Sequence, residues 1–230
     1  MFALKSPVIR RTLTLFAVLP LIVLCAGCAD FWVSDSSIQS VTVSPTALIL
    51  KAAQTGPPAV AGDSASISAT ATTVGGSSVT TGFTWTSSDT TDFTVTSAGS
   101  VTAIGTAADR TATITATNGG QSATCAILSY TGTTPTALNS IGGIPAASGQ
   151  LSPGQTFQLT ASANLSGNSS HDVTSYVSWV SSNTSAATVS TSGLVTVLST
   201  ATAAAQFTIT ATATISGTSI SSPAASFTVL

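Results

Sequence analysis

Apolar and polar side chains alternate at a spacing of two along several short segments of the chain. Residues 65–71 carry Ala or Ile at every second position, with Ser or Thr between them. The same alternation recurs at residues 112–116, 157–163 and 207–211. Since successive side chains of a β-strand point to opposite faces, this pattern predicts strands with one face buried. Turn signals such as Asn-Gly-Gly at 118–120 separate the segments and predict antiparallel connections.

The pattern occurs twice, at an offset of 94 residues. Trp85 begins the segment Trp-Thr-Ser-Ser-Asp-Thr, and Trp179 begins Trp-Val-Ser-Ser-Asn-Thr. Gly99 aligns with Gly193 at the same offset. The order of matching segments indicates an internal duplication.

The two copies span residues 37–131 and 136–230. Several short strands separated by turns in about 95 residues are typical of a sandwich domain. The sequence therefore predicts an all-β fold of two tandem immunoglobulin-like antiparallel β-sandwiches. Trp85 and Trp179 fall at inward positions and are predicted core side chains rather than platforms for sugars. The linker at 132–135 is short, which predicts limited motion between the copies.

The motifs at 41–45 (Val-Thr-Val-Ser-Pro), 85–89, 99–106 and 113–117 follow one another in an order that resembles bacterial Ig-like group 2 domains. These modules occur in invasin- and intimin-like surface proteins. The resemblance covers nearly all of the chain beyond the leader and is weaker at the start of the second copy. It implies a β-sandwich fold and roles as adhesin modules, stalks and spacers. It implies no catalytic residue.

The N-terminal residues read as an export signal. Lys5, Arg10 and Arg11 form a positive region ahead of an apolar run at 12–24. A run of about 13 residues suits a signal sequence, whereas a membrane-spanning helix needs about 20. We therefore expect residues 1–27 to be a signal peptide.

The ending Ala26-Gly27-Cys28 resembles the lipobox of bacterial lipoproteins, although Cys25 stands where that pattern prefers Leu. The resemblance implies that Cys28 is acylated, and that residues 28–36 form the lipidated N-terminus and a spacer. Two or more acyl chains suffice for stable anchoring. Ala29 follows in place of an inner-membrane retention Asp, so the expected location is the outer membrane or cell surface. Ordinary cleavage and an uncleaved anchor are the alternatives.

Charge excludes one class of partner. The chain has five basic residues, and only Lys51 and Arg110 lie beyond the leader. Without a basic surface to neutralise phosphates, nucleic-acid binding is not expected. If Cys25 leaves with the leader and Cys28 carries lipid, Cys125 remains alone. We predict no disulfide, and a buried, apolar role for Cys125.

The candidates for chemistry are few. His171-Asp172 with a serine could form a hydrolase triad, but sequence adjacency does not supply the geometry, so we predict a solvated loop histidine and no enzyme. Asp89 and Asp92 could contribute to a calcium site, yet Ca²⁺ needs six to eight oxygens, so we interpret them as turn residues. We expect no metal and no cofactor.

The resulting hypothesis is a non-catalytic cell-surface lipoprotein whose modules serve as structural, adhesive or spacer units. Its ligand would be a surface protein or a glycan, and its lipid would contact the membrane. The alternative is a carbohydrate-binding or envelope-assembly accessory that tethers an enzyme or complex. Trp32, near the lipid site, is expected at the membrane interface.

Overall fold

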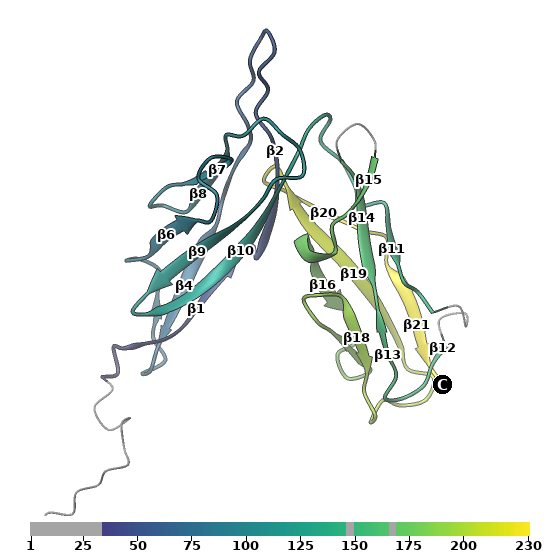
Figure 1. Cartoon of the computed structure of the whole chain (residues 1–230). Coiled ribbons are helices and arrows are strands. Elements are labelled where there is room, and N and C mark those ends of the chain that lie inside the picture. Colours follow the sequence, from purple (N-terminus) through teal and green to yellow (C-terminus); the bar gives the residue numbers. More distant parts are fainter. Residues whose placement is uncertain (1–33, 146–149, 166–168) are drawn as a thin grey trace, which may run out of the picture. The chain divides into compact units, whose positions relative to one another are not determined.

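The computed structural model describes residues 34–145, 150–165 and 169–230, and the regular secondary structure of these residues is almost entirely β-strand. Cys28, Trp32 and the predicted signal peptide lie outside the described residues. Contacts group Ser34–Leu230 into one compact unit. The all-β antiparallel fold expected from the alternating pattern is confirmed (Figure 1).

The first half of this unit contains the strands β1 to β10. β4 pairs with β1 and β5; β8 pairs with β3 and β7; and β10 pairs with β9, which also pairs with β6. These pairs are antiparallel, whereas β2 runs parallel to β10. Their bounds are β1 Ile38–Ser44, β2 Ala47–Lys51, β3 Ser64–Ser66, β4 Ser68–Thr73, β5 Ser78–Val79, β6 Thr84–Ser87, β7 Phe93–Val95, β8 Ser100–Ala103, β9 Thr111–Asn118 and β10 Gln121–Tyr130.

The second half repeats much of this arrangement. β14 pairs with β11 and β15, β18 pairs with β13 and β17, and β19 pairs with β16, β20 and β21. The bounds are β11 Ser140–Gly142, β12 Gln150–Leu151, β13 Thr156–Gln158, β14 Thr160–Leu165, β15 Ser169–Asp172, the 3₁₀ helix η2 Thr174–Tyr176, β16 Ser178–Ser181, β17 Ala187–Val189, β18 Leu194–Val197, β19 Gln206–Ile215, β20 Thr218–Ser221 and β21 Ala225–Val229.

The alternating segment at 65–71 crosses from one sheet to another. β3 belongs to the sheet of β8, and β4 belongs to the sheet of β1. The change falls at Ile67, whose amide donates to the Gly99 carbonyl at 2.8 Å. The second copy changes sheets in the same way at Leu159, whose amide donates to the Gly193 carbonyl at 2.9 Å. A strand that switches sheets makes a corner of a sandwich while its inward side chains stay buried.

Each half has its own cluster of buried apolar side chains. In the first, Ile114 and Cys125 face one another across β9 and β10 and are fully buried. In the second, Phe207 and Phe227 stack with ring centroids 5.2 Å apart. The alternation read from the sequence therefore placed the inward faces of these strands correctly.

β2 is buried on both faces. Leu48 and Leu50 belong to the core of the first half, whereas Ile49 between them belongs to the core of the second. β10 behaves similarly, because Cys125 and Ile127 face the first core and Tyr130 joins the second. These two strands therefore contribute side chains to both hydrophobic clusters.

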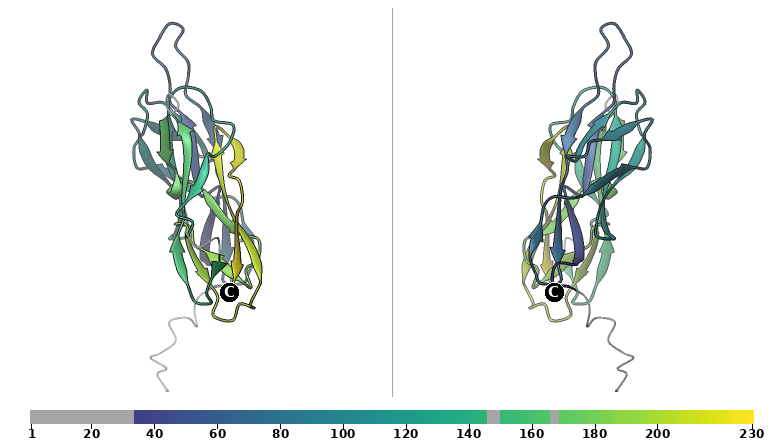
Figure 2. Two further views of the ribbon diagram at one scale, coloured as in Figure 1. Left: turned by 90° about the vertical axis from the view of Figure 1, so that its right-hand side faces the viewer. Right: turned by 90° about the vertical axis from the view of Figure 1, so that its left-hand side faces the viewer.

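One loop of the first half stands apart from the strands. Residues 52–63 connect β2 to β3 and project beyond the sheets (Figure 1, and again in both views of Figure 2). An antiparallel bridge between Gln54 and Val60 holds the two arms of the loop together. Val60 of this bridge is 47% exposed, whereas Ala52 at the base of the loop is buried.

Candidate functional site

Trp179 lies at the core of the second half. It sits on β16 opposite Ala211 of β19, and its side chain is 9% exposed. The indole Nε1 donates to the carbonyl of Thr174 at 3.4 Å. Thr174 opens η2, and Tyr176 at the end of that turn packs against the same core. The 3₁₀ turn therefore satisfies the polar end of the indole and helps to cover the second core.

Trp85 occupies the matching place on β6, opposite Ala116 of β9. It packs against the first core but is only half-buried, as is Phe83 two residues earlier. Within the described part of the chain, no 3₁₀ turn precedes β6. At the offset of 94 residues that aligns the two tryptophans, Gly82 aligns with Tyr176. One tryptophan of the pair is thus covered, and the other borders solvent.

An open groove of about 610 Å³ lies beside Trp85. We call it the Trp85 groove. Phe83 and Trp85 form its apolar wall, with ring centroids 6.4 Å apart. Its other sides come from β4, the residues just before β6 and the turn between β7 and β8. The full lining is Ser66, Ile67, Ser68, Ala69, Thr70, Thr80, Thr81, Gly82, Phe83, Trp85, Ser97 and Ala98.

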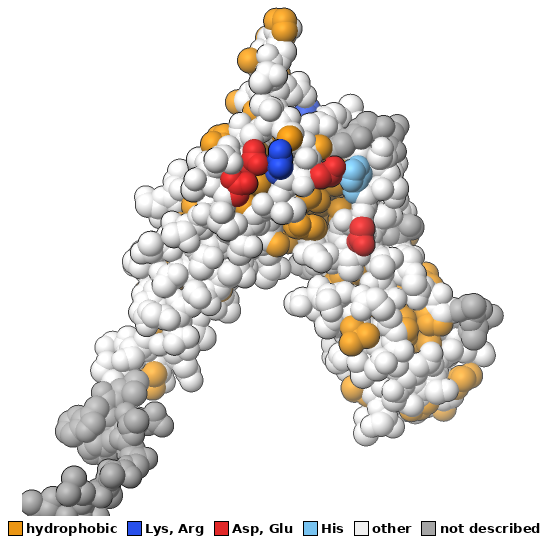
Figure 3. Space-filling view, in the orientation of Figure 1, with side chains coloured by type: hydrophobic (Ala, Val, Ile, Leu, Met, Phe, Trp, Pro, Cys, Tyr) orange, Lys and Arg blue, Asp and Glu red, His pale blue; other side chains and the backbone are white. Residues whose placement is uncertain are grey.

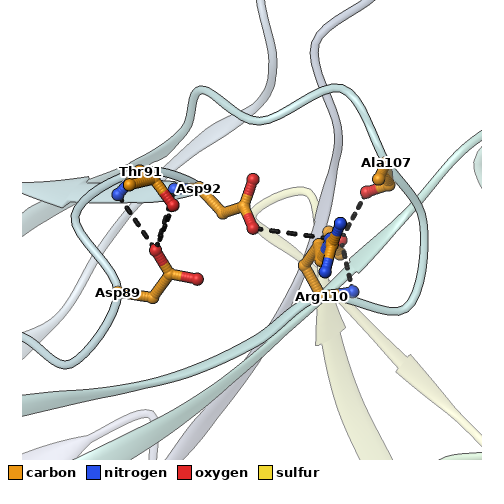
Figure 4. A network of polar contacts seen from close by, with 6 residues as sticks. Asp89, Thr91, Asp92, Ala107 and Arg110 are labelled. Atoms are coloured by element: carbon orange, nitrogen blue, oxygen red, sulfur yellow. Dashed lines mark hydrogen bonds and ion pairs between the residues drawn. The ribbon is translucent and has the colours of Figure 1, made fainter.

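Asp89 organises the turn that follows β6. Its Oδ1 accepts hydrogen bonds from the amide and hydroxyl of Thr91, at 2.9 and 2.6 Å, and from the amide of Asp92 at 3.2 Å (Figure 4). The bonds from Thr91, chiefly the one from its hydroxyl, lower the pKa of the Asp89 carboxyl below its usual value. Asn183 fills the same place in the second copy, where its Oδ1 accepts from the Ser185 hydroxyl at 2.6 Å.

Asp92 is directed toward Arg110 rather than toward Asp89. Its Oδ2 lies 3.6 Å from Arg110 Nε, and the arginine side chain is 58% exposed. An exposed pair of this kind contributes little to stability. The backbone beside Arg110 is held more firmly: the buried Ser129 hydroxyl accepts from the Arg110 amide at 3.0 Å and donates to the Ala107 carbonyl at 2.9 Å.

His171 and Asp172 do not form the pair considered from the sequence. His171 Nδ1 lies 3.2 Å from Asp109 Oδ1, whereas Asp172 Oδ1 accepts from the Thr174 amide at 2.9 Å. The expected loop location is also wrong, because His171 is on β15 and its side chain is only 23% exposed. Pairing of residues 169–172 with β14 extends the strand through the histidine. Figure 3 shows acidic, basic and histidine side chains gathered in one region of the visible face.

Cys125 is fully buried in the first core, as its apolar surroundings predicted. Burial raises the pKa of its thiol to about 12. The thiolate is the reactive form of cysteine, so this side chain is inert at neutral pH.

A junction of polar and apolar contacts links the two halves. The Tyr130 hydroxyl lies 2.8 Å from Thr134 Oγ1 and 2.9 Å from Ser216 Oγ, and its single proton serves one of these two hydrogen bonds at a time. The Ser216 hydroxyl also donates to Asp63 Oδ2, and its amide donates to the Ile49 carbonyl at 2.8 Å. Asp63 Oδ2 accepts the Lys51 amide at 3.1 Å as well. The turn between β19 and β20 is thereby bonded to the first half.

None of these junction residues was predicted from the sequence. The available signal was the unbroken apolar run Ala47-Leu-Ile-Leu50, which departs from the period-two pattern of the other strands. A strand buried on both faces gives such a run, whereas a strand with one face in water alternates. The partner of that run, the turn at Ser216-Gly217, carries no comparable signal, because Ser-Gly turns are common in any β protein.

The described residues contain no group of three or more His, Cys, Asp or Glu side chains placed to hold a metal ion. Nor do they include a helix with the length and apolar character needed to cross a bilayer. Together the strands, cores and junction define a class of protein, an all-β chain of immunoglobulin-like architecture.

Comparison with known families gives a more particular assignment for part of the chain. Residues 144–221 match the bacterial Ig-like domain (group 2). Among curated protein sequences, none matches the chain at a significant level.

Several solved structures align with most of the chain at low sequence identity. Domains 5–6 of the S-layer protein SbsC align over 84% of this chain and 97% of that chain, at 18% identity and a TM-score of 0.33. The EC1-2 structure of human protocadherin-24 aligns over 85% of this chain and 98% of that one, at 12% identity and a TM-score of 0.30. The structure of murine CEACAM1b aligns over 83% of this chain and 99% of that chain, at 12% identity and a TM-score of 0.26.

Proposed function

We propose that this chain is a non-catalytic lipoprotein of the bacterial cell surface, whose two Ig-like modules form a structural and adhesive unit. The junction is the observation that carries the proposal. A display module works at a distance from its anchor only if the segments between them resist bending. Here the short linker, the Tyr130–Ser216 and Ser216–Asp63 hydrogen bonds and the shared strand β2 all oppose such bending.

The sequence of the N-terminal segment supports the location. The positive residues, the short apolar run and Ala26-Gly27-Cys28 are those of an exported lipoprotein, with Cys28 as the acylated residue. Anchoring through acyl chains on Cys28 would leave the modules in the aqueous phase, with residues 28–36 as the spacer. The match of residues 144–221 to the bacterial Ig-like domain (group 2) supports the non-catalytic role.

Metabolic labelling tests the anchor. Cells expressing the full chain are grown with an alkyne fatty-acid analogue, and label is compared among wild type, Cys28→Ser and Cys125→Ser. We expect the label to be lost only in Cys28→Ser, which should then leave the membrane fraction. Equal labelling of wild type and Cys28→Ser would contradict the proposal. Accessibility of an epitope tag after Leu230 to antibody on intact cells tests surface display separately.

A further inference from the structure

We infer that the Trp85 groove is a binding site for a neutral carbohydrate. This deepens the proposed function, on which it rests in one respect: the first module must meet ligands outside the cell. Its volume of about 610 Å³ falls within the range of ligand pockets. The inference depends on three properties of the groove: its aromatic wall, its hydroxyl-bearing sides and its lack of charge.

The aromatic wall is the first property. Phe83 and Trp85 are both half-buried, with their rings inclined at 49°. The face of an aromatic ring carries partial negative charge, so it attracts the weakly positive C–H groups on the face of a sugar ring. Within the described residues, Trp85 Nε1 has no hydrogen-bond acceptor, whereas the matching atom of Trp179 bonds to the Thr174 carbonyl. An indole N–H beside a groove can donate to a ligand oxygen.

The hydroxyl groups are the second property. Thr80, Thr81 and Ser97 are exposed at the groove, and their hydroxyls have no hydrogen-bond partner within the described part of the chain. A hydroxyl both donates and accepts, as does each hydroxyl of a sugar. These side chains can therefore exchange hydrogen bonds with a carbohydrate without a change in backbone structure.

The lack of charge is the third property, and it selects among ligands. None of the lining residues is acidic or basic. A sialylated or uronic-acid-containing sugar would find no cation to pair with its carboxylate. The groove therefore fits uncharged hexose or N-acetylhexosamine units. A proline-rich peptide also docks on aromatic walls, but such a peptide does not need the unpaired hydroxyls that surround this wall.

The duplication shows that this opening is specific to the first module. In the second module, η2 lies where the first has Thr80, Thr81 and Gly82. Tyr176 packs on the core there, and Trp179 is 9% exposed. In the first module Gly82 replaces that tyrosine, so the matching indole borders the groove. The second module thus supplies matched control positions for every variant.

The test uses the full chain, purified in a detergent without a sugar headgroup. The probe is an array of immobilised neutral hexose and N-acetylhexosamine oligosaccharides, with sialylated and uronic-acid-containing oligosaccharides and a proline-rich decapeptide as comparators. Affinities for array hits are then measured by titration in solution. The blocking variant is Ser97→Tyr, which fills the groove from an exposed turn, and its control is Thr191→Tyr at the matching turn. Trp85→Phe and Trp179→Phe form a second pair, in which each position keeps an aromatic ring.

We expect binding to one or more neutral oligosaccharides, weakened about tenfold or more by Ser97→Tyr and by Trp85→Phe and changed less than about twofold by the two controls. Urea unfolding of each variant shows that the fold is retained. No binding to any neutral sugar, binding unaffected by Ser97→Tyr, or preference for the acidic sugars or the decapeptide would overturn the inference. Labelling of Cys28 is independent of all these outcomes. If no oligosaccharide on the array binds and Cys28 is labelled, sugar binding at the Trp85 groove is refuted and lipid anchoring at Cys28 is not.

Discussion

At the scale of single residues, Gly99 and Gly193 both have a positive φ, and a Cβ at either would lie against a backbone carbonyl oxygen and a tryptophan ring. Gly193 has a φ of +84°, and a Cβ at this position would lie 2.6 Å from the Leu159 carbonyl oxygen and 3.1 Å from Trp179 Cζ2. The Gly193 carbonyl also accepts the hydrogen bond at which β13 passes into β14. Any side chain here would disturb the corner strand and the tryptophan together.

Replacement of Gly193 by Ala should lower the free energy of unfolding by about 3 kcal/mol, because positive-φ strain and the clash with Leu159 add. Gly154→Ala is the matched control, since its φ is +81° but no atom lies within 4 Å of the added Cβ. In Gly154→Ala the free energy of unfolding should fall by about 1 kcal/mol, from backbone strain alone. Urea unfolding followed by circular dichroism measures both. Equal losses of unfolding free energy in Gly193→Ala and Gly154→Ala would show that the contacts of the added Cβ at Gly193 do not affect stability.

Cys125 should be unreactive in the folded chain, because burial raises its pKa to about 12 from the ordinary 9.0. Iodoacetamide at pH 8, followed by mass spectrometry of the peptide that contains Cys125, should show modification only after unfolding in urea. Rapid modification of the native chain would contradict the buried position.

The same shift makes stability depend on alkaline pH. The thiol of Cys125 ionises near pH 9.0 in the unfolded chain and near pH 12 in the folded chain. The stability that the buried, protonated thiol contributes is therefore intact below pH 9 and is lost as pH rises between these values. Thermal melts should show a lower melting temperature at pH 11 than at pH 8. The difference between the two temperatures should be smaller in Cys125→Ala.

At the scale of elements, β6 and β16 have the same strand pattern, but the tryptophan of β6 is half-buried and that of β16 is buried. Both tryptophans pair with an alanine across the sheet, Trp85 with Ala116 and Trp179 with Ala211. Their exposure differs because η2 precedes β16 while Gly82 and its neighbours precede β6. The segment before the strand, rather than the strand itself, decides how far the indole is covered.

Trp179→Ala should cost about 3–5 kcal/mol, the range for truncating a buried aromatic side chain to leave a cavity. Trp85→Ala should cost less, since part of its ring is already in contact with water. Urea unfolding monitored by circular dichroism compares the two without reliance on tryptophan fluorescence. If Trp85→Ala were the more damaging change, the difference in burial between the copies would be refuted.

At the scale of the whole molecule, the junction makes the two halves depend on one another. Tyr130 is fully buried, and its hydroxyl joins the linker residue Thr134 to Ser216 in the turn between β19 and β20. β2 adds apolar contact with both cores. The described strands should therefore unfold together rather than as two separate modules.

Tyr130→Phe tests this dependence, because it removes the hydroxyl and leaves the ring. We expect the free energy of unfolding to fall by about 1–2 kcal/mol and proteolysis within residues 132–135 to become faster, since the part-buried contacts of the hydroxyl with Thr134 and Ser216 disappear. Tyr176→Phe is the control, as its hydroxyl has no partner within the described residues. Limited proteolysis and calorimetry measure the effects. Unchanged cleavage in Tyr130→Phe would show that the hydroxyl does not hold the junction.

The sequence by itself determined the all-β class and the inward faces of the strands, since a period of two follows directly from backbone geometry. It also showed that the motifs recur at an offset of 94 residues. It also indicated that Cys125 is buried. It misplaced His171, which was expected in a loop, because only the pairing with β14 makes residues 169–172 a strand. The pairing of Asp109 with His171, the link from Asp63 through Ser216 to Tyr130 and the open side of Trp85 all depend on tertiary structure. The first two are contacts between residues far apart in the chain. The open side of Trp85 depends on whether the residues just before its strand pack over the ring, which the period-two pattern of the strand does not encode.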